Sequence, residues 1–442
     1  MGSDNSKILI LILFIFFLQV IPTFADHRSK LNIYFTGEEK GRLEPCGCQT
    51  EQLGGLSRRH FFLQHVVAPG KLSFLLSNGD LIGGALRQDE LKFETTLQAM
   101  NVMGYGVLNL GEEECLLGLE TLQSMESLAH FPFLSSNVVD QLGNPIFRSV
   151  ISKDIDINGI IYKVKILGVL SLKFQQVIAS RLFIKSPQEA IQGFFQKEED
   201  SHLFWILLYH GDIEEAIEIA KLFPQLNLII AGHGKEDPPH QPIWVGQTIL
   251  VSEAVGGKWI GEMHFLFDEK GKGNFENLKF IPLDDQVKSS EDIKKIMDEY
   301  QSRLKDEALY KKEEGRMKGG GQTFVGSQVC QSCHQNAFHV WENSRHWHAY
   351  ESLLPIHHPF DPDCLVCHSV GFRYEGGFKG KELTSSLAFV GCESCHGGGL
   401  LHVLSPMIQP MNRSGEGTCI TCHDSENSPQ FDFEKYWEKI KH

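Results

Sequence analysis

Four copies of a Cys-x-x-Cys-His motif constrain this chain more than any other feature. They use eight of the 11 cysteines: Cys330-Cys333-His334, Cys364-Cys367-His368, Cys392-Cys395-His396 and Cys419-Cys422-His423. The two thiols of each motif lie about one helical turn apart, so both can form thioethers along one haem edge while the histidine reaches the iron. A zinc ribbon or thiol redox pairs could explain a lone Cys-x-x-Cys, but four copies ending in histidine favour haem. The motifs therefore predict four haem c groups.

The four motif histidines are the predicted proximal iron ligands, but the motif does not fix the ligand on the opposite side. A second histidine gives a low-spin electron-transfer site, a methionine raises the reduction potential, and an empty position leaves room for small-molecule chemistry. The candidates are His339, His346, His348, His357, His358, His402, His442, Met407 and Met411.

Further short motifs surround the haem motifs: Val325-Gly326-Ser327, Trp341-x-x-Ser344-x-His346, Ser369-Val370-Gly371-Phe372, Gly397-Gly398-Gly399-x-x-His402 and Tyr436-Trp437-x-x-Ile440-x-His442. With the Cys-x-x-Cys-His copies they resemble the tetrahaem cytochrome family that accepts electrons from hydroxylamine oxidation. The resemblance covers nearly all of residues 322–442. It implies His346 and His402, then His442, as distal ligands, and one five-coordinate haem. The alternative is that these are surface histidines near a haem.

The segment before the haem motifs alternates apolar runs with amphipathic stretches. Strands are predicted at 31–35, 73–77, 105–110, 202–209 and 226–231, and helices at 88–103, 116–128, 187–198 and 213–223. This alternation predicts a layered α/β sandwich. A hairpin around Asn158-Gly159 and late strands at 248–252 and 262–267 predict a mixed sheet.

These patterns divide the chain into four predicted parts. Residues 1–25 are typical of a signal peptide, because Lys7 precedes an apolar run too short for the ~20 residues of a bilayer span. An uncleaved anchor is the alternative. Residues 26–288 form the α/β domain, 289–321 a charged, solvent-exposed helix and glycine hinge, and 322–442 a mostly helical, haem-stabilised domain. We expect a periplasmic or otherwise exported protein with no stable membrane span after cleavage.

The net charge of −15 excludes nucleic acids and anionic membrane surfaces as partners. It favours a basic redox partner protein. The charge says nothing of the oligomeric state.

Five short motifs occur in order within residues 31–283: Glu38-Glu39-Lys40-Gly41, Gly79-Asp80, Gly111-Glu112-Glu113-Glu114, Tyr209-His210-Gly211 and Gly232-His233-Gly234-Lys235. They resemble the motifs of calcineurin-like metallophosphoesterases, in particular exported 5'-nucleotidases. That resemblance implies a two-metal active site. Here Glu and Lys replace Asp and His of the first motif, two Glu residues replace Asn and His of the third, and Lys235 replaces the last His.

These replacements oppose the chemistry that the resemblance implies. A two-metal phosphoesterase needs both ions to activate water, and a protonated lysine cannot be a ligand. We therefore expect a metallophosphoesterase-like domain that does not hydrolyse phosphoesters. Asp80, His210 and His233 could still hold one metal ion, supported by Glu38, Glu112 or Glu113. The alternative is a hydrogen-bonded remnant.

Three cysteines remain outside the haem motifs. Cys46 and Cys48 lie in Glu44-Pro45-Cys46-Gly47-Cys48, which resembles a segment of a divergent group of exported phosphoesterase-like proteins, and Cys115 follows the altered third motif. Together they could bind a soft metal ion or form a reactive thiol site. The alternative is a Cys48–Cys115 disulfide.

The leading interpretation is an electron carrier whose N-terminal domain docks a partner or houses a redox-active site. One alternative is an oxidoreductase that acts on a small nitrogen, oxygen or sulfur species at an open haem or cysteine site. Another is a metal-dependent, nucleotidase-like phosphohydrolase.

Overall fold

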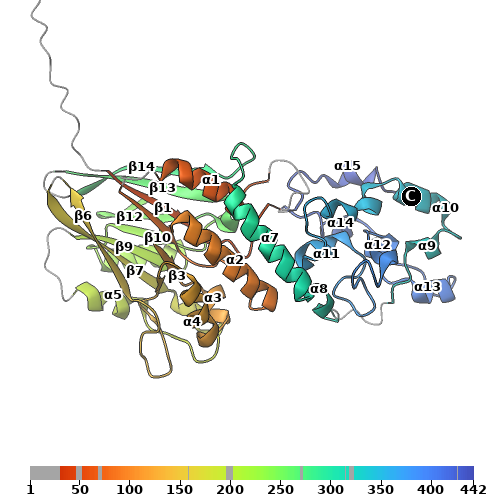
Figure 1. Ribbon diagram of the computed structural model, residues 1–442, viewed down its shortest axis with the longest axis horizontal. Coiled ribbons are helices and arrows are strands. Elements are labelled where there is room, and N and C mark those ends of the chain that lie inside the picture. The colour runs from red at the N-terminus through yellow and green to blue at the C-terminus, as the bar shows by residue number, and fades with distance from the viewer. Residues whose placement is uncertain are drawn as a thin grey trace, which may run out of the picture.

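The computed structural model places an α/β lobe beside a lobe of short helices (Figure 1). It describes residues 30–45, 52–67, 72–157, 159–195, 203–268, 272–313, 315–317, 323–425 and 427–442. The predicted signal peptide, Cys46, Cys48 and the glycine run 319–321 lie outside the described residues. Within those residues, every helix is too short or too polar to cross a lipid bilayer.

Two six-stranded sheets form the centre of the N-terminal lobe. The first has the order β14-β13-β1-β2-β3-β4 and comprises β1 (Lys30–Thr36), β2 (Ser73–Ser77), β3 (Val107–Asn109), β4 (Phe133–Leu134), β13 (Trp259–Phe267) and β14 (Gly273–Pro282). The second has the order β11-β12-β10-β9-β7-β6 and comprises β6 (Val150–Ile157), β7 (Ile160–Leu170), β9 (Leu203–His210), β10 (Leu228–Ala231), β11 (Ile243–Val245) and β12 (Thr248–Ser252). A small ribbon pairs β5 (Val138–Val139) with β8 (Phe183–Ile184).

Both sheets are mixed, as predicted. Strands β1 to β4 run parallel to their neighbours, whereas β13 is antiparallel to β1. Strands β6 and β7 form the predicted hairpin and pair antiparallel. Alternate apolar side chains such as Ile33 and Ile206 face each other between the sheets and form one core cluster.

Helices cover the outer face of each sheet. α1 (Leu56–Val66), α2 (Arg87–Met103), α3 (Glu112–Leu116), α4 (Leu119–Leu128) and α7 (Glu291–Asp306) pack on the first sheet, and α5 (Pro187–Phe195) and α6 (Ile213–Leu222) on the second. The lobe is therefore a four-layered α/β sandwich, which confirms the predicted fold class for this part of the chain (Figure 1).

The expectation of a solvent-exposed helix after residue 289 is wrong. Ile293, Met297, Tyr300 and Leu304 of α7 are buried and pack against the N-terminal core. They recur at helical spacing, so they form an apolar stripe that the many charged residues of this segment conceal in the sequence. α7 therefore belongs to the wall of the α/β lobe.

The C-terminal lobe is built from short helices. These are α8 (Leu309–Lys312), α9 (Ser327–Cys330), α10 (Gln335–Glu342), α11 (Pro362–His368), α12 (Cys392–His396), α13 (Leu400–Leu404), α14 (Glu416–Cys419) and α15 (Phe433–Trp437). The described residues beyond Pro282 contain no strand. Their apolar cluster is small and includes Phe338, Trp341 and Phe389. This lobe matches the predicted helical class.

The two lobes meet at the start of α11. The buried carboxylate of Asp361 accepts hydrogen bonds from Gln88 of α2 (2.9 Å) and Gln301 of α7 (3.2 Å). Asp361 also caps α11 by accepting from the backbone N–H of Asp363 (3.0 Å). One side chain thus joins three helices from both lobes.

Candidate functional site

The haem motifs lie on the short helices of the C-terminal lobe. The backbone N–H of His334 donates to the carbonyl of Cys330, and that of His423 to the carbonyl of Cys419, each at 2.9 Å. These i to i+4 bonds place the histidine of each motif one helical turn from its first cysteine. The motif geometry that haem attachment requires is therefore present in the backbone.

Three motif histidines each face a second histidine. The ring centroids are 6.1 Å apart for His334 and His402, 6.2 Å for His423 and His346, and 6.0 Å for His396 and His442. Since a metal–imidazole bond is about 2 Å long, two imidazoles on opposite sides of one iron have centroids roughly 6 Å apart. The three pairs fit haem iron, and they involve the three histidines that the sequence predicts as distal ligands.

Hydrogen bonds orient several of these rings. Nδ1 of His368, His396, His402 and His442 lies 2.6 to 2.9 Å from the backbone carbonyls of Ala349, Asn412, Gln409 and Ile440, respectively. An Nδ1–H that donates to a carbonyl leaves Nε2 as the free ligand atom and fixes the ring direction. The chain thus selects the nitrogen that iron would bind.

The cysteine sulfurs bring the four motifs into contact with one another. The thiol of Cys330 contacts that of Cys392, and the thiol of Cys367 contacts that of Cys422. Burial and the neighbouring sulfurs of Cys419 and Cys422 raise the pKa of the Cys395 thiol to about 11. The four motifs therefore adjoin in the order first, third, fourth, second.

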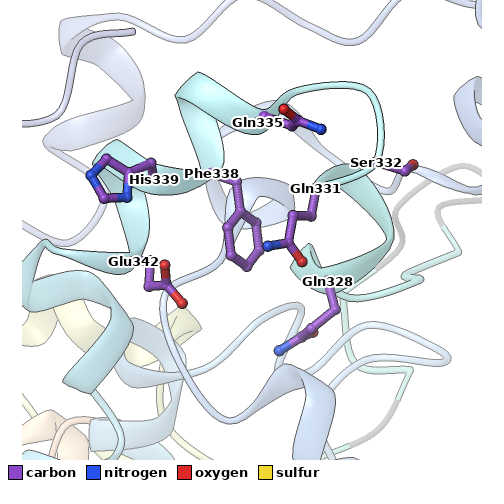
Figure 2. Close-up of a pocket in the computed structure, with 7 residues that line it drawn as sticks. All are labelled: Gln328, Gln331, Ser332, Gln335, Phe338, His339 and Glu342. Carbon is purple, nitrogen blue, oxygen red and sulfur yellow. The ribbon is translucent and has the colours of Figure 1, made fainter.

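Other candidate ligands have different neighbours. His348 lies 3.0 Å from Glu351, and Met407 is 94% exposed. His339 lies on the wall of an open pocket of about 520 Å³ on α9 and α10, in which Phe338 takes the centre (Figure 2). The pocket is lined by Gln328, Gln331, Ser332, Gln335, Phe338, His339 and Glu342.

A second group of functional side chains lies at the carboxyl ends of parallel strands in the N-terminal lobe. Glu38 and Lys40 follow β1, Asp80 follows β2, His210 ends β9 and His233 follows β10. Carboxyl ends of parallel strands meet at one edge of a sheet, and here the edges of both sheets converge. The predicted metal-ligand residues of this domain therefore come together.

Lys40 lies among the acidic groups of this site. Its Nζ is 2.5 Å from Asp80 Oδ2 and 3.3 Å from Glu38 Oε2. Burial alone would lower the pKa of Lys40, but the carboxylates of Asp80 and Glu38 outweigh it and raise that pKa above its usual value. Lys235, which replaces the last histidine of the motifs, differs from Lys40 because it is exposed.

The two histidines lie against a shared carboxylate. His210 Nε2 is 2.9 Å from Glu112 and 3.3 Å from Asp80, and His233 Nε2 is 3.2 Å from Glu112. Burial would lower the pKa of His210, but Asp80 and Glu112 raise it well above its usual value. Burial would raise the pKa of Glu112, but the neighbouring imidazoles of His210 and His233 lower it.

The backbone around this group is strained. Glu38, Lys40, Asp80 and His233 have φ values of 57°, 53°, 56° and 48°, in the left-handed region that non-glycine residues seldom adopt. Strained backbone of this kind clusters at binding and active sites. The site therefore retains the local geometry of a functional centre despite its altered residues.

Two further buried glutamates at this site were not among the predicted ligands. Glu114 accepts hydrogen bonds from the backbone N–H groups of Asp80 (2.9 Å) and Leu81 (2.6 Å), and burial raises its pKa to about 8. Glu253 follows β12, and burial raises its pKa well above the usual value. The one sequence signal for Glu253 is an acidic residue directly after a short strand whose three central residues are apolar.

The alternative of a Cys48–Cys115 disulfide involves Cys48, which lies outside the described residues, so it stays untested. Cys115 is fully buried beneath the site, where burial raises the pKa of its thiol well above the usual value. It is part of the apolar core cluster, so packing against its neighbours explains its position.

Comparisons with known proteins divide the chain in the same way. Residues 329–397 match the family described as Cytochrome c554 and c-prime. Cytochrome c-554 of Nitrosomonas europaea is 33% identical over 107 residues, which are 21% of this chain and 46% of that protein. The C-terminal part therefore resembles the tetrahaem cytochrome family, as predicted.

The N-terminal part is similar to nucleotide phosphoesterases. The trifunctional nucleotide phosphoesterase YfkN of Bacillus subtilis is 22% identical over 298 residues, covering 58% of this chain and 20% of that protein. The crystal structure of a 5'-nucleotidase precursor from Thermus thermophilus superposes with a TM-score of 0.52 at 20% identity, over 63% of this chain and 59% of that one. This shows the fold, and in each comparison the chain spans less than two thirds of the known protein.

Proposed function

We propose that this chain is an exported multihaem cytochrome c that transfers electrons through four covalently bound haems. The observation that carries this proposal is the pairing of three motif histidines with a second histidine at ring distances near 6 Å. When bound, the haems supply reversible one-electron chemistry, and histidine on both sides of the iron favours electron transfer over ligand binding.

The chain's own residues position and connect the sites. Backbone carbonyls hold the ligand rings through Nδ1, which limits rearrangement when the charge of the site changes. The contacts of Cys330 with Cys392 and of Cys367 with Cys422 bring neighbouring attachment sites together, so little protein separates them. Electrons would then move along the series first, third, fourth, second, in either direction.

Export and a basic redox partner are further parts of this proposal. The apolar run 8–20 after Lys7 supports a signal peptide. The net charge of −15 would attract a cationic partner over distances set by the ionic strength.

The N-terminal lobe, in this proposal, does not hydrolyse phosphoesters. The short contact of Lys40 with Asp80 supports this, because an ammonium group lies where a catalytic cation would be needed. Phosphate release from nucleotides, assayed with Mg²⁺, Mn²⁺, Zn²⁺ and Co²⁺, should stay at the level of a blank. Release that disappears in Asp80→Asn would contradict the proposal and favour a phosphohydrolase.

Potentiometric titration of the purified protein, followed by visible absorption, tests electron transfer. We expect reversible uptake of four electrons per chain and sharp low-spin bands from three haems. Uptake of fewer electrons, or ligand-induced spectral shifts at most of the haems, would contradict the proposal and favour an oxidoreductase that acts on a small molecule.

A further inference from the structure

The two-metal centre of the phosphoesterase fold does not fit the N-terminal site. Two adjacent divalent ions need side chains around them that donate lone pairs. At this site the positively charged ammonium of Lys40 instead contacts both Asp80 and Glu38. A protonated lysine has no lone pair for a metal and repels a cation at this range. One of the two ion positions is therefore taken by the chain itself.

The remaining groups still form a compact set of ligands. Glu38, Asp80, His210 and His233 each offer one ligand atom, and these atoms all lie within 4.8 Å of one another. Two imidazoles with two carboxylates suit zinc, iron or manganese, which bind nitrogen and oxygen ligands together. In this set Glu38 stands for the aspartate of the first motif, whereas the histidine of that motif is lost to Lys40.

A buried nitrogen points into this set. His210 is fully buried, and its Nε2 makes no hydrogen bond of acceptable geometry, although carboxylates of Glu112 and Asp80 lie close by. The other ring nitrogen, Nδ1, lies 2.6 Å from the backbone carbonyl of Asn78, which fixes the ring. This is the arrangement that a metal-binding histidine adopts, with Nδ1–H donating and Nε2 left for the ion.

We propose that this site binds one divalent transition-metal ion through Glu38, Asp80, His210 and His233, with the Lys40 ammonium in place of a second cation. Glu112 contacts both histidines, so it either binds the ion as a further ligand or holds the two imidazole rings in place. The negative charges of Glu112, Glu38 and Asp80 together exceed the single positive charge of Lys40. One divalent ion would therefore also relieve the repulsion among these carboxylates.

The segment that carries Lys40 also reaches the second haem motif. Gly41, next to Lys40, packs closely on the side chain of Lys92. A Cβ atom added to this glycine would lie 3.3 Å from Lys92 Nζ. The same Nζ forms an ion pair with Asp363, which precedes Cys364. Glu44, further along the segment, lies 3.4 Å from His358. Residues 38–44 are thus a wall shared by the ion site and α11.

This shared wall gives the ion an expected effect, which rests on the proposed function. A cation near a haem favours the reduced form, because reduction adds an electron to the centre. An ion bound at Asp80 should therefore raise the midpoint potential of the haem attached at Cys364 and Cys367 more than that of the other three.

Metal analysis of the holoprotein tests the ion site. After chelation and dialysis against Zn²⁺ or Mn²⁺, we expect one ion per chain in addition to haem iron. Asp80→Asn should weaken its binding by about 100-fold, as loss of a ligand is at least as severe as loss of a supporting group. Zero or two tightly bound ions in the unaltered protein would overturn the proposal.

The lysines provide a matched pair of variants. Lys40→Met removes the ammonium and frees Asp80, Glu112 and Glu113, a second set of ligand atoms within 4.8 Å, so we expect two ions per chain. Lys235→Met, an exposed lysine of the same site's last motif, should leave one ion. A single ion in Lys40→Met would refute the role of this lysine. If Asp80→Asn fails to fold, His233→Ala, with a partly exposed ring, takes its place.

The haem potentials give an independent readout. Zn²⁺ should raise one of the four midpoint potentials more than the other three in the unaltered protein, and should raise none in Asp80→Asn. Four unchanged potentials in the presence of a bound ion would overturn the coupling to α11. Failure of the electron-transfer proposal would look different, because the haem count or the electron count would be low whatever the metal content.

Discussion

His346 and His423 face each other with ring centroids 6.2 Å apart, although one follows the first haem motif and the other ends the fourth. His402 likewise follows the third motif and faces His334 of the first. Each of these contacts ties two motifs that are distant in the sequence. A single iron held by such a pair would therefore also cross-link the fold of the C-terminal lobe.

Replacing His346 should convert one haem from low spin to high spin. His346→Ala removes one of the two paired imidazoles and would open a coordination position on the iron that we propose His423 binds. We expect a new high-spin ferric signal in electron paramagnetic resonance, of about one haem per chain, and binding of carbon monoxide at that haem. His348→Ala, an exposed neighbour that contacts Glu351, is the control and should leave the spectrum unchanged. An unaltered spectrum in His346→Ala would remove His346 as a ligand.

Loss of the Asp361 carboxylate should loosen the contact between the lobes. Asp361→Ala removes the cap of α11 and the hydrogen bonds from Gln88 and Gln301, and we expect a loss of roughly 1–3 kcal/mol in stability. Calorimetry should show a lower transition temperature. Asp432→Ala is the matched control, because Asp432 caps the exposed helix α15 by accepting from the backbone N–H of Lys435 in that helix (3.0 Å). Equal effects of the two variants would contradict the role of Asp361 between the lobes.

The contact between α1 and α7 should weaken in acid. His60 is buried with Nδ1 2.6 Å from Ser290 Oγ, and burial lowers its pKa below the usual value. The unfolded chain then binds the proton more tightly, so this stability is fully present above pH ~6.5 and is lost as the pH falls below it. Amide hydrogen exchange in α1 and α7 should be faster at pH 5.5 than at pH 7.5 after correction for the intrinsic rates.

Two variants separate His60 from other acid effects. His60→Gln keeps a polar partner for Ser290 but no longer titrates, so the difference between the two pH values should shrink. His65→Gln, on the exposed side of the same helix, should retain the difference. The same pH dependence in all three proteins would rule out His60 as its source.

Local patterns predicted most of the N-terminal fold. The apolar runs of the sequence correspond to strands of both sheets. The spaced motifs identified Asp80, His210 and His233 as neighbours, because residues that follow parallel strands lie at the same edge of a sheet. The burial of α7 was not predicted, because charged residues dominate its composition. Only the helical spacing of its few apolar residues indicates the buried stripe.

Long-range contacts could not be predicted in this way. The sequence names His346, His402 and His442 as candidates, but the motif that each one faces depends on how short helices pack across the lobe. The sequence left the role of Cys115 open, because a cysteine beside a motif can be a core residue or a ligand and only its burial separates the two. Glu253 was missed because an isolated glutamate after a strand has no spacing to mark it.

The most direct test of the central claim is the intact mass of the mature protein, produced in a host that attaches c-type haem. We expect the mass of the chain without its predicted signal peptide plus four covalent haems, and loss of one haem in Cys364→Ser/Cys367→Ser. A mass that corresponds to the bare polypeptide would contradict the account of this protein as a multihaem cytochrome.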